Sequence, residues 1–304
     1  MSTLVPPLAA AITYLQAIIL GLLQGVTELF PISSLGHTVL FPTLFGWEGV
    51  VKSQSQQESY WLAFVVMLHV GSAVGILIYF WHEYVAIVKG FFRTLRTRSV
   101  RTPDERMAWL IIAASIPAGV LGLAFEHVLR TVTAKPELAA IFLTLNGIVL
   151  FAAERFRRRA EVRELAAREG AKPDGGRELD TLEYREAFVI GIAQSTALIA
   201  GISRDGVTMG AGLARGLDHR DAARFAFLLA APIILAAGVF KLPDLLGPLG
   251  NGVRGQALVA AIAAAVAAVF TVGFLLRFFR TRTLMPFAIY CLVFGGFMIV
   301  YTQT

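Results

Sequence analysis

The stretch GLLQGVTELFPISSLGHT, residues 21–38, occurs a second time in this chain as GIAQSTALIAGISRDGVT, residues 191–208. The two copies align without a gap at an offset of 170 positions (191 − 21), and six of their eighteen positions are identical. Each copy is an apolar half-helix that breaks at Pro31 or Gly201 and continues as a polar turn containing serine. Broken hydrophobic segments at matching places in two halves predict an inverted repeat, with the functional site where the two segments meet.

The composition is that of a polytopic membrane protein. Hydrophobic residues make up 56% of the 304 residues and charged residues only 16%, whereas soluble proteins carry about 25% charged residues. The net charge of +6 does not indicate nucleic-acid binding, because the arginine runs fall between apolar segments without interleaved aromatic residues. The single cysteine, Cys291, excludes a disulfide framework and a thiolate metal site. We therefore expect one integral membrane domain over residues 1–304.

Six apolar segments have about the length that a bilayer-spanning helix needs, and they are residues 61–81, 107–125, 137–153, 222–240, 256–276 and 284–301. Basic loops should be cytoplasmic and less basic loops external, which places 89–106, 154–186 and 277–283 inside and 47–60, 126–136 and 241–255 outside. These assignments agree only if both copies of the repeated stretch are re-entrant. The predicted fold is all-α, with six transmembrane helices and two re-entrant helical hairpins in an inverted-topology repeat. Its parts are repeat one 1–153, cytoplasmic loop 154–186 and repeat two 187–304.

The first copy carries the parts of an activated nucleophile. Gln24 and Glu28 are four positions apart and therefore share one helix face. A glutamate at membrane depth is costly and marks a functional site by default, although a hydrogen-bonded structural glutamate is the alternative. Ser34 is spaced to present its hydroxyl near His37, and serine, histidine and glutamate together can supply a nucleophile. The other histidines are interpreted as structural: a buried span residue at His69, and loop or interface residues at His82, His127 and His219.

The second copy carries the residue that suits an anion. An arginine within a re-entrant turn needs an anionic partner, and the guanidinium of Arg204 matches phosphate geometry. Pairing with Asp205 or Glu28 is the simpler alternative. Ser33 and its counterpart Ser203 follow the two breaks, where a serine is most often a helix N-cap. Two half-helix N-termini at one place would add backbone N–H donors, so the pattern predicts phosphoryl chemistry with a divalent cation bound through Glu28.

These residues resemble the signatures of a known family. QGVTE at 24–28 followed by PISSLGH at 31–37 resembles the first signature of the bacterial undecaprenyl-diphosphate phosphatases, the bacitracin-resistance family. AGISRDGVT at 200–208 resembles the second signature, P-G-x-S-R-S-x-x-T. The resemblance continues through IAASIP at 112–117, through Asn146 and Gly147, and through AARFAFLL at 222–229, so it covers nearly the whole chain.

The resemblance implies an activity and a location. Members of the family hydrolyse undecaprenyl diphosphate to the monophosphate lipid carrier for peptidoglycan and other envelope glycans, and they give resistance to bacitracin. Their fold of six transmembrane helices and two re-entrant hairpins agrees with the count made above. The resemblance places the protein in the bacterial cytoplasmic membrane, with a site that opens toward the outer face and uses a divalent cation, Mg²⁺ or Ca²⁺.

The resemblance also implies roles for single residues. Ser34 is the leading candidate nucleophile, with His37 or Glu28 as its base; attack by a histidine or by an activated water stays open. Arg204 is expected to hold the phosphoryl oxygens, and Glu28 to bind the metal ion. The remaining site residues are expected to bind or orient the substrate, namely Gln24, Ser33, Ser203, Asp205 and Thr208.

Two positions depart from the second signature. Ala200 stands where the family has proline, which loosens the turn, and Asp205 stands where the family has serine. Asp205 could bind the metal ion and so replace a ligand that the neutral Gln24 does not provide. It could instead pair with Arg204 and lower the affinity for phosphate.

A lipid-phosphate transporter or flippase with the same inverted-repeat architecture is the main alternative function. Transport of an anion needs Arg204 but has no use for a nucleophile and base at Ser34 and His37. A membrane scaffold would leave Glu28 and Arg204 at membrane depth without a role. The expected partners are the undecaprenyl diphosphate lipid and the bilayer, with no nucleic acid; the oligomeric state stays open, with a homodimer among the options.

Overall fold

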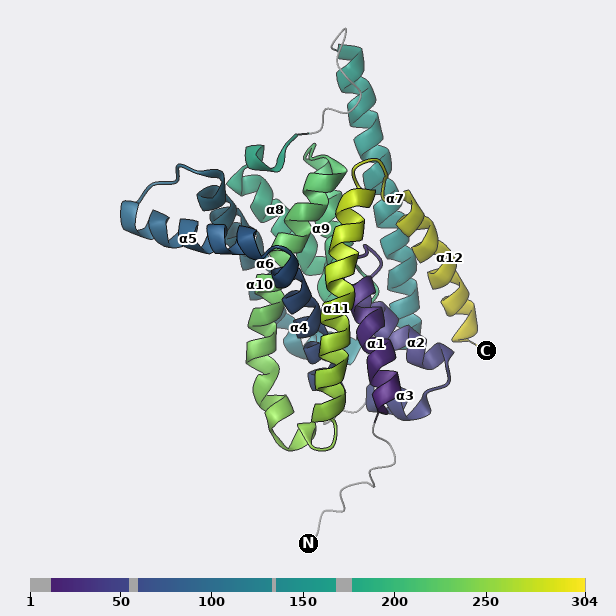
Figure 1. The fold of residues 1–304 in the computed structure, drawn as a ribbon. Helices are drawn as coiled ribbons and strands as arrows, with labels where there is room; N and C mark the ends of the chain where they lie inside the picture. Colours follow the sequence, from purple (N-terminus) through teal and green to yellow (C-terminus); the bar gives the residue numbers. More distant parts are fainter. Residues whose placement is uncertain (1–11, 55–59, 133–134, 168–176, 304) are drawn as a thin grey trace.

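The computed structural model of this chain describes residues 12–54, 60–132, 135–167 and 177–303. Within these residues the chain forms α-helices and short 3-10 turns, and no β-strand (Figure 1). The helices are α1 (Tyr14–Thr27), α2 (Ser34–Leu44), α3 (Glu48–Gln54), α4 (Tyr60–Tyr79), α5 (Trp81–Thr97), α6 (Pro103–Val132), α7 (Pro136–Ala167), α8 (Tyr184–Ser195), α9 (Arg204–Ala214), α10 (His219–Leu246), α11 (Arg254–Phe278) and α12 (Met285–Tyr301).

The repeated stretch forms two broken helices, as the sequence predicts. In the first copy, α1 ends at Thr27 and α2 begins at Ser34, because a proline at 31 disfavours helix in the residue before it. In the second copy, α8 is followed by a short 3-10 turn and α9 begins at Arg204. Figure 1 shows α1 rising from the lower end of the bundle, where the N-terminus lies, whereas α8 and α9 lie in its upper half. The two breaks therefore approach each other from different ends of the bundle.

The two halves exchange packing partners through matched glycines. A Cβ added at Gly21 of α1 would collide with the carbonyl oxygen of Ala260 on α11, and one added at Gly191 of α8 would collide with that of Ala114 on α6. Gly21 and Gly191 occupy the same position in the two copies. Small residues let helix backbones approach this closely within a membrane. Each broken helix therefore packs against a long helix of the other half.

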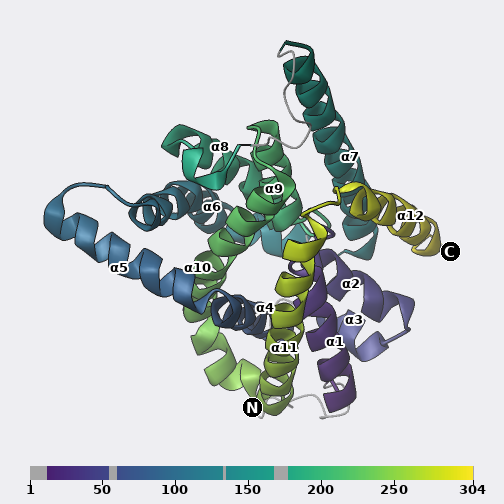
Figure 2. The ribbon, with the colours of Figure 1, turned by 45° about the horizontal axis from the view of Figure 1, so that its top comes forward.

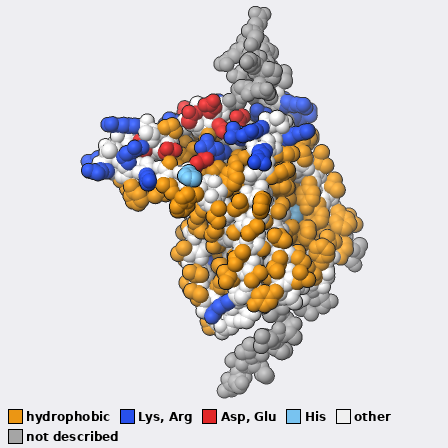
Figure 3. Space-filling view, in the orientation of Figure 1, with side chains coloured by type: hydrophobic (Ala, Val, Ile, Leu, Met, Phe, Trp, Pro, Cys, Tyr) orange, Lys and Arg blue, Asp and Glu red, His pale blue; other side chains and the backbone are white. Residues whose placement is uncertain are grey.

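Among the described residues, five helices are long and apolar enough to cross a bilayer, at Tyr60–Tyr79, Pro103–Ala124, Pro136–Arg159, His219–Pro243 and Arg254–Phe278. The sixth expected span, 284–301, forms α12, an apolar helix of only 17 residues. Figure 3 shows hydrophobic side chains forming a broad band over this face, with Lys, Arg, Asp and Glu side chains gathered at its upper end. The protein is therefore a multi-pass membrane protein.

Two expected loops are helical instead. The basic segment 89–106 was expected to be a loop, but α5 extends through it to Thr97 and α6 begins at Pro103. In Figures 1 and 2, α5 extends away from the side of the bundle. Its buried residues, Tyr84, Ile87, Gly90 and Thr94, recur every three or four positions, as expected for an amphipathic helix at an interface. Likewise, α7 continues beyond residue 153 to Ala167, so the predicted loop 154–186 begins as helix.

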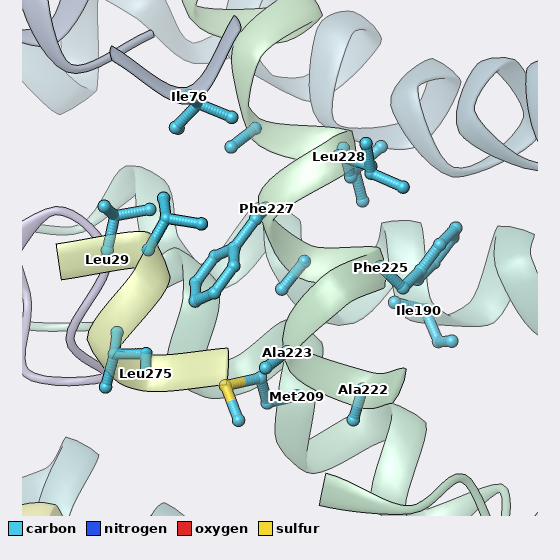
Figure 4. Packing of buried hydrophobic residues seen from close by; sticks show 14 of the residues in the cluster. Leu29, Ile76, Ile190, Met209, Ala222, Ala223, Phe225, Phe227, Leu228 and Leu275 are labelled. Carbon is cyan, nitrogen blue, oxygen red and sulfur yellow. The ribbon is translucent and has the colours of Figure 1, made fainter. Parts of the chain in front are cut away.

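The buried hydrophobic core lies directly behind the breaks. It includes Leu29, which follows Glu28, and Met209, which lies in α9. Figure 4 shows the Phe227 ring from α10 among residues of this cluster that include Leu29, Leu275 and Met209. Because helices from both halves contribute to one cluster, the core holds the two broken helices in a common position.

Candidate active site

The two turns at the helix breaks are in direct contact. Ser33 has a φ of 68°, which a residue with a side chain rarely adopts. Its Oγ accepts hydrogen bonds from the backbone N–H of Gly36 at 3.3 Å and of Gly201, in the other turn, at 3.1 Å. Gly201 has a φ of 100°, which glycine adopts at little cost. Ser33 therefore caps α2 and joins the two repeats at once.

Asn146 of α7 holds the same two turns together. Its Nδ2 donates to the carbonyl oxygen of Pro31 at 2.9 Å, and its Oδ1 accepts from the backbone N–H of Ser203 at 2.9 Å. Asn146 is fully buried, so both bonds lie away from water. The amide thus uses its donor on the first turn and its acceptor on the second. These two bonds fix the distance between the N-termini of α2 and α9.

Glu28 lies at the centre of the site. Its Oε2 accepts hydrogen bonds from Gln24 Nε2 at 2.9 Å and from the Ser34 hydroxyl. Its Oε1 accepts from Arg204 Nη2 at 2.9 Å. Gln24 and Glu28 thus share one helix face as expected, and the break brings Ser34 back onto that face. The contact with Arg204 brings the first and second copies of the repeat into one site.

His69 completes this cluster, although its place in an apolar segment predicts only a buried span residue. Its Nε2 lies 3.5 Å from Ser34 Oγ and 3.4 Å from Glu28 Oε2. Its Nδ1–H donates to the carbonyl oxygen of Val65 at 2.8 Å, which leaves Nε2 directed at the serine. The side chain is 23% exposed, whereas that of Glu28 is 5% exposed. The expectation of a buried span residue is therefore corrected: His69 links the buried pair to the surface. A histidine within an apolar span was the available signal.

His37 does not face Ser34, contrary to the expectation. Its Nδ1–H donates to the carbonyl oxygen of Ser33 at 2.7 Å, and its Nε2 accepts from the Tyr290 hydroxyl at 2.8 Å. The ring stacks on Tyr290 and on Phe294 of α12. Both nitrogens are thus engaged away from the Ser34 hydroxyl. In this geometry His37 supports the strained Ser33 turn and anchors α2 to α12.

Arg204 contacts both carboxylates of the site. Its Nη2 bonds Glu28 Oε1 and also lies 3.1 Å from Asp205 Oδ1, so the simpler alternative of ion pairing is realised with both partners. Its Nη1 is buried and makes no hydrogen bond to any described residue. The Nη2 nitrogen is therefore held by the two carboxylates, while Nη1 can donate a hydrogen bond to a phosphoryl oxygen.

The other residues of the second turn divide into bonded and unbonded groups. Ser203 Oγ accepts from the Gly206 backbone N–H at 3.1 Å, so this serine is the N-cap of α9. Thr208 Oγ1 and both carboxylate oxygens of Asp205 are buried without a hydrogen-bond partner among the described residues. Asp205 is fully buried, and a carboxylate that makes no hydrogen bond in such a place is costly. Thr208 and Asp205 thus keep unused polar capacity beside Arg204.

The remaining histidines lie outside this cluster. His219 is buried, and its Nε2 lies 2.8 Å from Glu154 Oε2, so it is a paired interior residue rather than the loop or interface residue expected. His82 is exposed on α5, as expected for an interface residue. The side chain of His127 falls outside the described part of the structure.

The residues present fit an open cation site better than a closed one. Both oxygens of Glu28 already bond protein donors, and the described residues contain no group of three or more His, Cys, Asp or Glu that could hold a metal ion. Asp205 adds a second carboxylate to the site, and neither of its oxygens makes a hydrogen bond to a described residue. Mg²⁺ commonly binds through one or two carboxylates plus substrate phosphates. The donor set fits that arrangement.

Chemically, the arrangement can activate a hydroxyl beside an anion site. The Ser34 hydroxyl donates to a carboxylate that is held in place by Gln24 and Arg204. Such a carboxylate can accept the proton as the oxygen attacks. The starts of α2 and α9 meet at the contact between the two turns, and Arg204 is the first residue of α9, so backbone N–H groups and the guanidinium can stabilise developing negative charge near this contact.

Comparisons with known proteins identify the family to which this chain is similar. A family model described as bacitracin resistance protein BacA matches residues 17–297. Undecaprenyl-diphosphatase 2 of Frankia alni is 50% identical, with 94% of this chain and 96% of that protein covered. The undecaprenyl-diphosphatases of Mycolicibacterium paratuberculosis and Mycobacterium avium are each 52% identical, with 97% of this chain and 99% of those proteins covered.

Proposed function

Because this chain belongs to the bacitracin resistance protein BacA family, we propose that it hydrolyses undecaprenyl diphosphate to undecaprenyl phosphate and inorganic phosphate. One observation carries the proposal: the Ser34 hydroxyl donates to Glu28, and Glu28 pairs with Arg204 from the other repeat. A nucleophile, its base and a guanidinium that can bind phosphate thus share one buried site. The product would be the lipid carrier for peptidoglycan synthesis, and its recycling would give bacitracin resistance.

In the proposed reaction, Ser34 Oγ attacks the terminal phosphorus of the diphosphate while Glu28 Oε2 accepts the hydroxyl proton. The bond between that phosphorus and the bridging oxygen breaks, and undecaprenyl phosphate leaves. Water then attacks the phosphoserine, which releases inorganic phosphate and restores Ser34. Before this second step, the proton that Glu28 took from Ser34 passes to the solution through the partly exposed His69. Glu28 then deprotonates the attacking water and gives that proton to the Ser34 oxygen as its bond to phosphorus breaks. Direct attack by water, with Glu28 as its base, is the alternative first step.

Arg204 is proposed to hold the phosphoryl oxygens through Nη1, and the N-termini of α2 and α9 add backbone N–H donors. Ser203 and Ser33 hold these two turns in shape, and Gln24 orients Glu28. Mg²⁺ or Ca²⁺ would be held by the carboxylates of Glu28 and Asp205 together with diphosphate oxygens. When bound, the cation would neutralise part of the charge of the diphosphate.

The finer topology is also proposed. Counting α12 as a span gives six transmembrane helices, with α1–α2 and α8–α9 as re-entrant hairpins of an inverted repeat. The charged end of the molecule in Figure 3 would face the cytoplasm. Because α1 enters from the opposite end, the site would open toward the outer face of the bacterial cytoplasmic membrane. A homodimer stays a prediction, to be tested by native mass spectrometry.

The alternative function, a lipid-phosphate transporter, finds no support in the comparisons, whose named relatives are diphosphatases. A Ser34 hydroxyl bonded to a buried carboxylate would also have no use in transport. The chemistry and the family therefore favour hydrolysis.

The decisive experiment measures phosphate release from undecaprenyl diphosphate by the detergent-purified protein, with and without a chelator. Ser34→Ala and Arg204→Ala should each reduce release by about a thousandfold or more, in line with the loss of a nucleophile or an anion-stabilising donor. Ser115→Ala is the control, since that hydroxyl bonds the Ile111 carbonyl oxygen of its own helix. Lipid binding without release by the wild type would reject the proposed function.

A further inference from the structure

Several buried oxygens of the site make no hydrogen bond to a described residue, although one of them, Asp205 Oδ1, lies 3.1 Å from the Arg204 guanidinium. They are Asp205 Oδ1 and Oδ2, Gln24 Oε1 and Thr208 Oγ1. Three of these four atoms can only accept hydrogen bonds, because Asp205 is a carboxylate and the amide group of Gln24 already donates to Glu28. Buried acceptors without donors are rare in folded proteins. The Asp205 carboxylate therefore has capacity for a further partner that carries positive charge or donors.

The unsatisfied carboxylate lies beside the reacting groups. Arg204 Nη2 is 3.1 Å from Asp205 Oδ1 and 2.9 Å from Glu28 Oε1, so these two oxygens are at most 6.0 Å apart (3.1 + 2.9). Asp205 and Thr208 are three positions apart on α9 and share a helix face. An oxygen-lined position thus adjoins the guanidinium that would bind the diphosphate.

The diphosphate itself cannot satisfy these acceptors. A phosphoryl group brings further acceptor oxygens and negative charge, so it pairs with Arg204 Nη1 but is repelled by Asp205. With Arg204 as the cation of the second turn and Glu28 and Asp205 as anions, the three side chains have an excess of one negative charge. Since like charges in a buried site are costly, a cation between the carboxylate and the phosphates resolves the conflict.

The simpler interpretation, a protonated structural Asp205, fits the geometry less well. A carboxylic acid buried away from water would donate its proton to a nearby acceptor. Neither Asp205 oxygen has such a partner within the described residues. Glu28, by contrast, already accepts hydrogen bonds from Gln24, Ser34 and Arg204.

We propose that Asp205 is the principal protein ligand of the divalent cation in this protein, with Thr208 beside it and diphosphate oxygens completing the coordination. Hard cations such as Mg²⁺ and Ca²⁺ prefer oxygen ligands. In this chain the carboxylate lies one residue after the phosphate-binding arginine, on the second repeat rather than the first. This inference rests on the proposed function for the identity of the substrate oxygens, but the protein ligand is defined by the buried acceptors alone.

The test titrates the detergent-purified full chain with Mn²⁺, with and without inorganic diphosphate. Electron paramagnetic resonance measures the concentration of unbound Mn²⁺ and so gives the affinity. We expect the wild type to bind Mn²⁺ and Mg²⁺ to displace it. Asp205→Asn and Asp205→Ser should each weaken Mn²⁺ binding by about tenfold or more. Asp180→Asn is the control, because that carboxylate is exposed on the turn Leu179–Thr181. The Asp180→Asn variant should bind Mn²⁺ with the affinity of the wild type.

Two results would overturn the inference: Mn²⁺ binding by either Asp205 variant with wild-type affinity, or no Mn²⁺ binding by the wild type with or without diphosphate. The two variants differ in size and shape, so a folding defect in one, detected by thermal unfolding, leaves the other to decide. Phosphate release measured on the same preparations separates the two proposals. If the wild type releases phosphate in a metal-dependent way but Asp205→Asn binds Mn²⁺ as the wild type does, the assignment of Asp205 as a ligand is rejected and the proposed function stands. If the wild type binds Mn²⁺ through Asp205 but releases no phosphate, the ligand stands and the proposed function is rejected.

Discussion

Arg204 Nη2 lies 2.9 Å from Glu28 Oε1, although 176 positions separate the two residues in the chain. This ion pair joins the first copy of the repeat to the second copy inside the protein. Because the Ser34 hydroxyl donates to the other oxygen of Glu28, the pair also sets the position of the base. The Glu28 carboxylate therefore takes part both in the contact between the repeats and in the proposed reaction.

The Glu28–Arg204 pair should stabilise the fold as well as support the reaction. Arg204→Met leaves a buried carboxylate unpaired, and the loss of one partner of a buried pair costs about 3–5 kcal/mol. The double variant Arg204→Met/Glu28→Gln removes both charges and should recover part of that loss without recovering activity. Thermal unfolding in detergent and phosphate release are the two measurements. Equal stability of Arg204→Met and the wild type would show that the pair carries no structural weight.

His69 and His37 should respond differently to substitution. His69 lies near Ser34 Oγ and Glu28 Oε2, so His69→Ala should lower the turnover rate by about a hundredfold while stability changes little. Tyr290→Phe removes the hydroxyl that donates a hydrogen bond to His37 Nε2. This loss should cost about 1 kcal/mol of stability and leave the turnover rate within about tenfold of the wild type. Turnover and unfolding are measured on both variants. A larger turnover loss in Tyr290→Phe than in His69→Ala would reverse the assignment.

Asn146 should be required for the contact between the two turns. Asn146→Leu keeps a similar volume but leaves the Pro31 carbonyl and the Ser203 N–H without their partners, and each buried unsatisfied group costs about 1–3 kcal/mol. We expect a lower unfolding temperature and a reduced turnover rate together, because the starts of α2 and α9 lose their common support. Thr144→Val, on the same helix, is the control, since that hydroxyl bonds the Ala140 carbonyl of its own helix. The prediction fails if the two variants unfold alike.

The matched glycines should be equally intolerant of a side chain. Gly21→Ala and Gly191→Ala place a Cβ against a carbonyl oxygen of a helix from the other half, and overpacking of this kind costs about 1–3 kcal/mol. Gly119→Ala on α6 is the matched control, because a Cβ there meets no atom within 4 Å. Thermal unfolding of the three variants provides the comparison. Unequal effects at Gly21 and Gly191 would mean that the two repeats do not share this packing.

The fold was predictable as far as local signals reach. Apolar length predicted the long helices, and glycine, proline and serine at matching positions predicted the two breaks, because these residues act on their own backbone. The same approach misjudged 89–106 and 154–186 as loops. Charged residues exclude a segment from the bilayer interior but do not prevent it from being helical, so α5 and the end of α7 were not anticipated.

The sequence by itself determined which residues of the two repeated stretches are candidates for the site, since Gln24, Glu28, Ser34 and Arg204 stand out as polar groups within apolar segments, and the structure brings these four side chains into contact. The tertiary structure alone decided the direction of His37 toward Tyr290 and the presence of His69 and Asn146 beside the breaks. The physical reason is that spacing along a helix defines which residues share a face. The neighbour that each face meets depends on the packing of helices far apart in the chain.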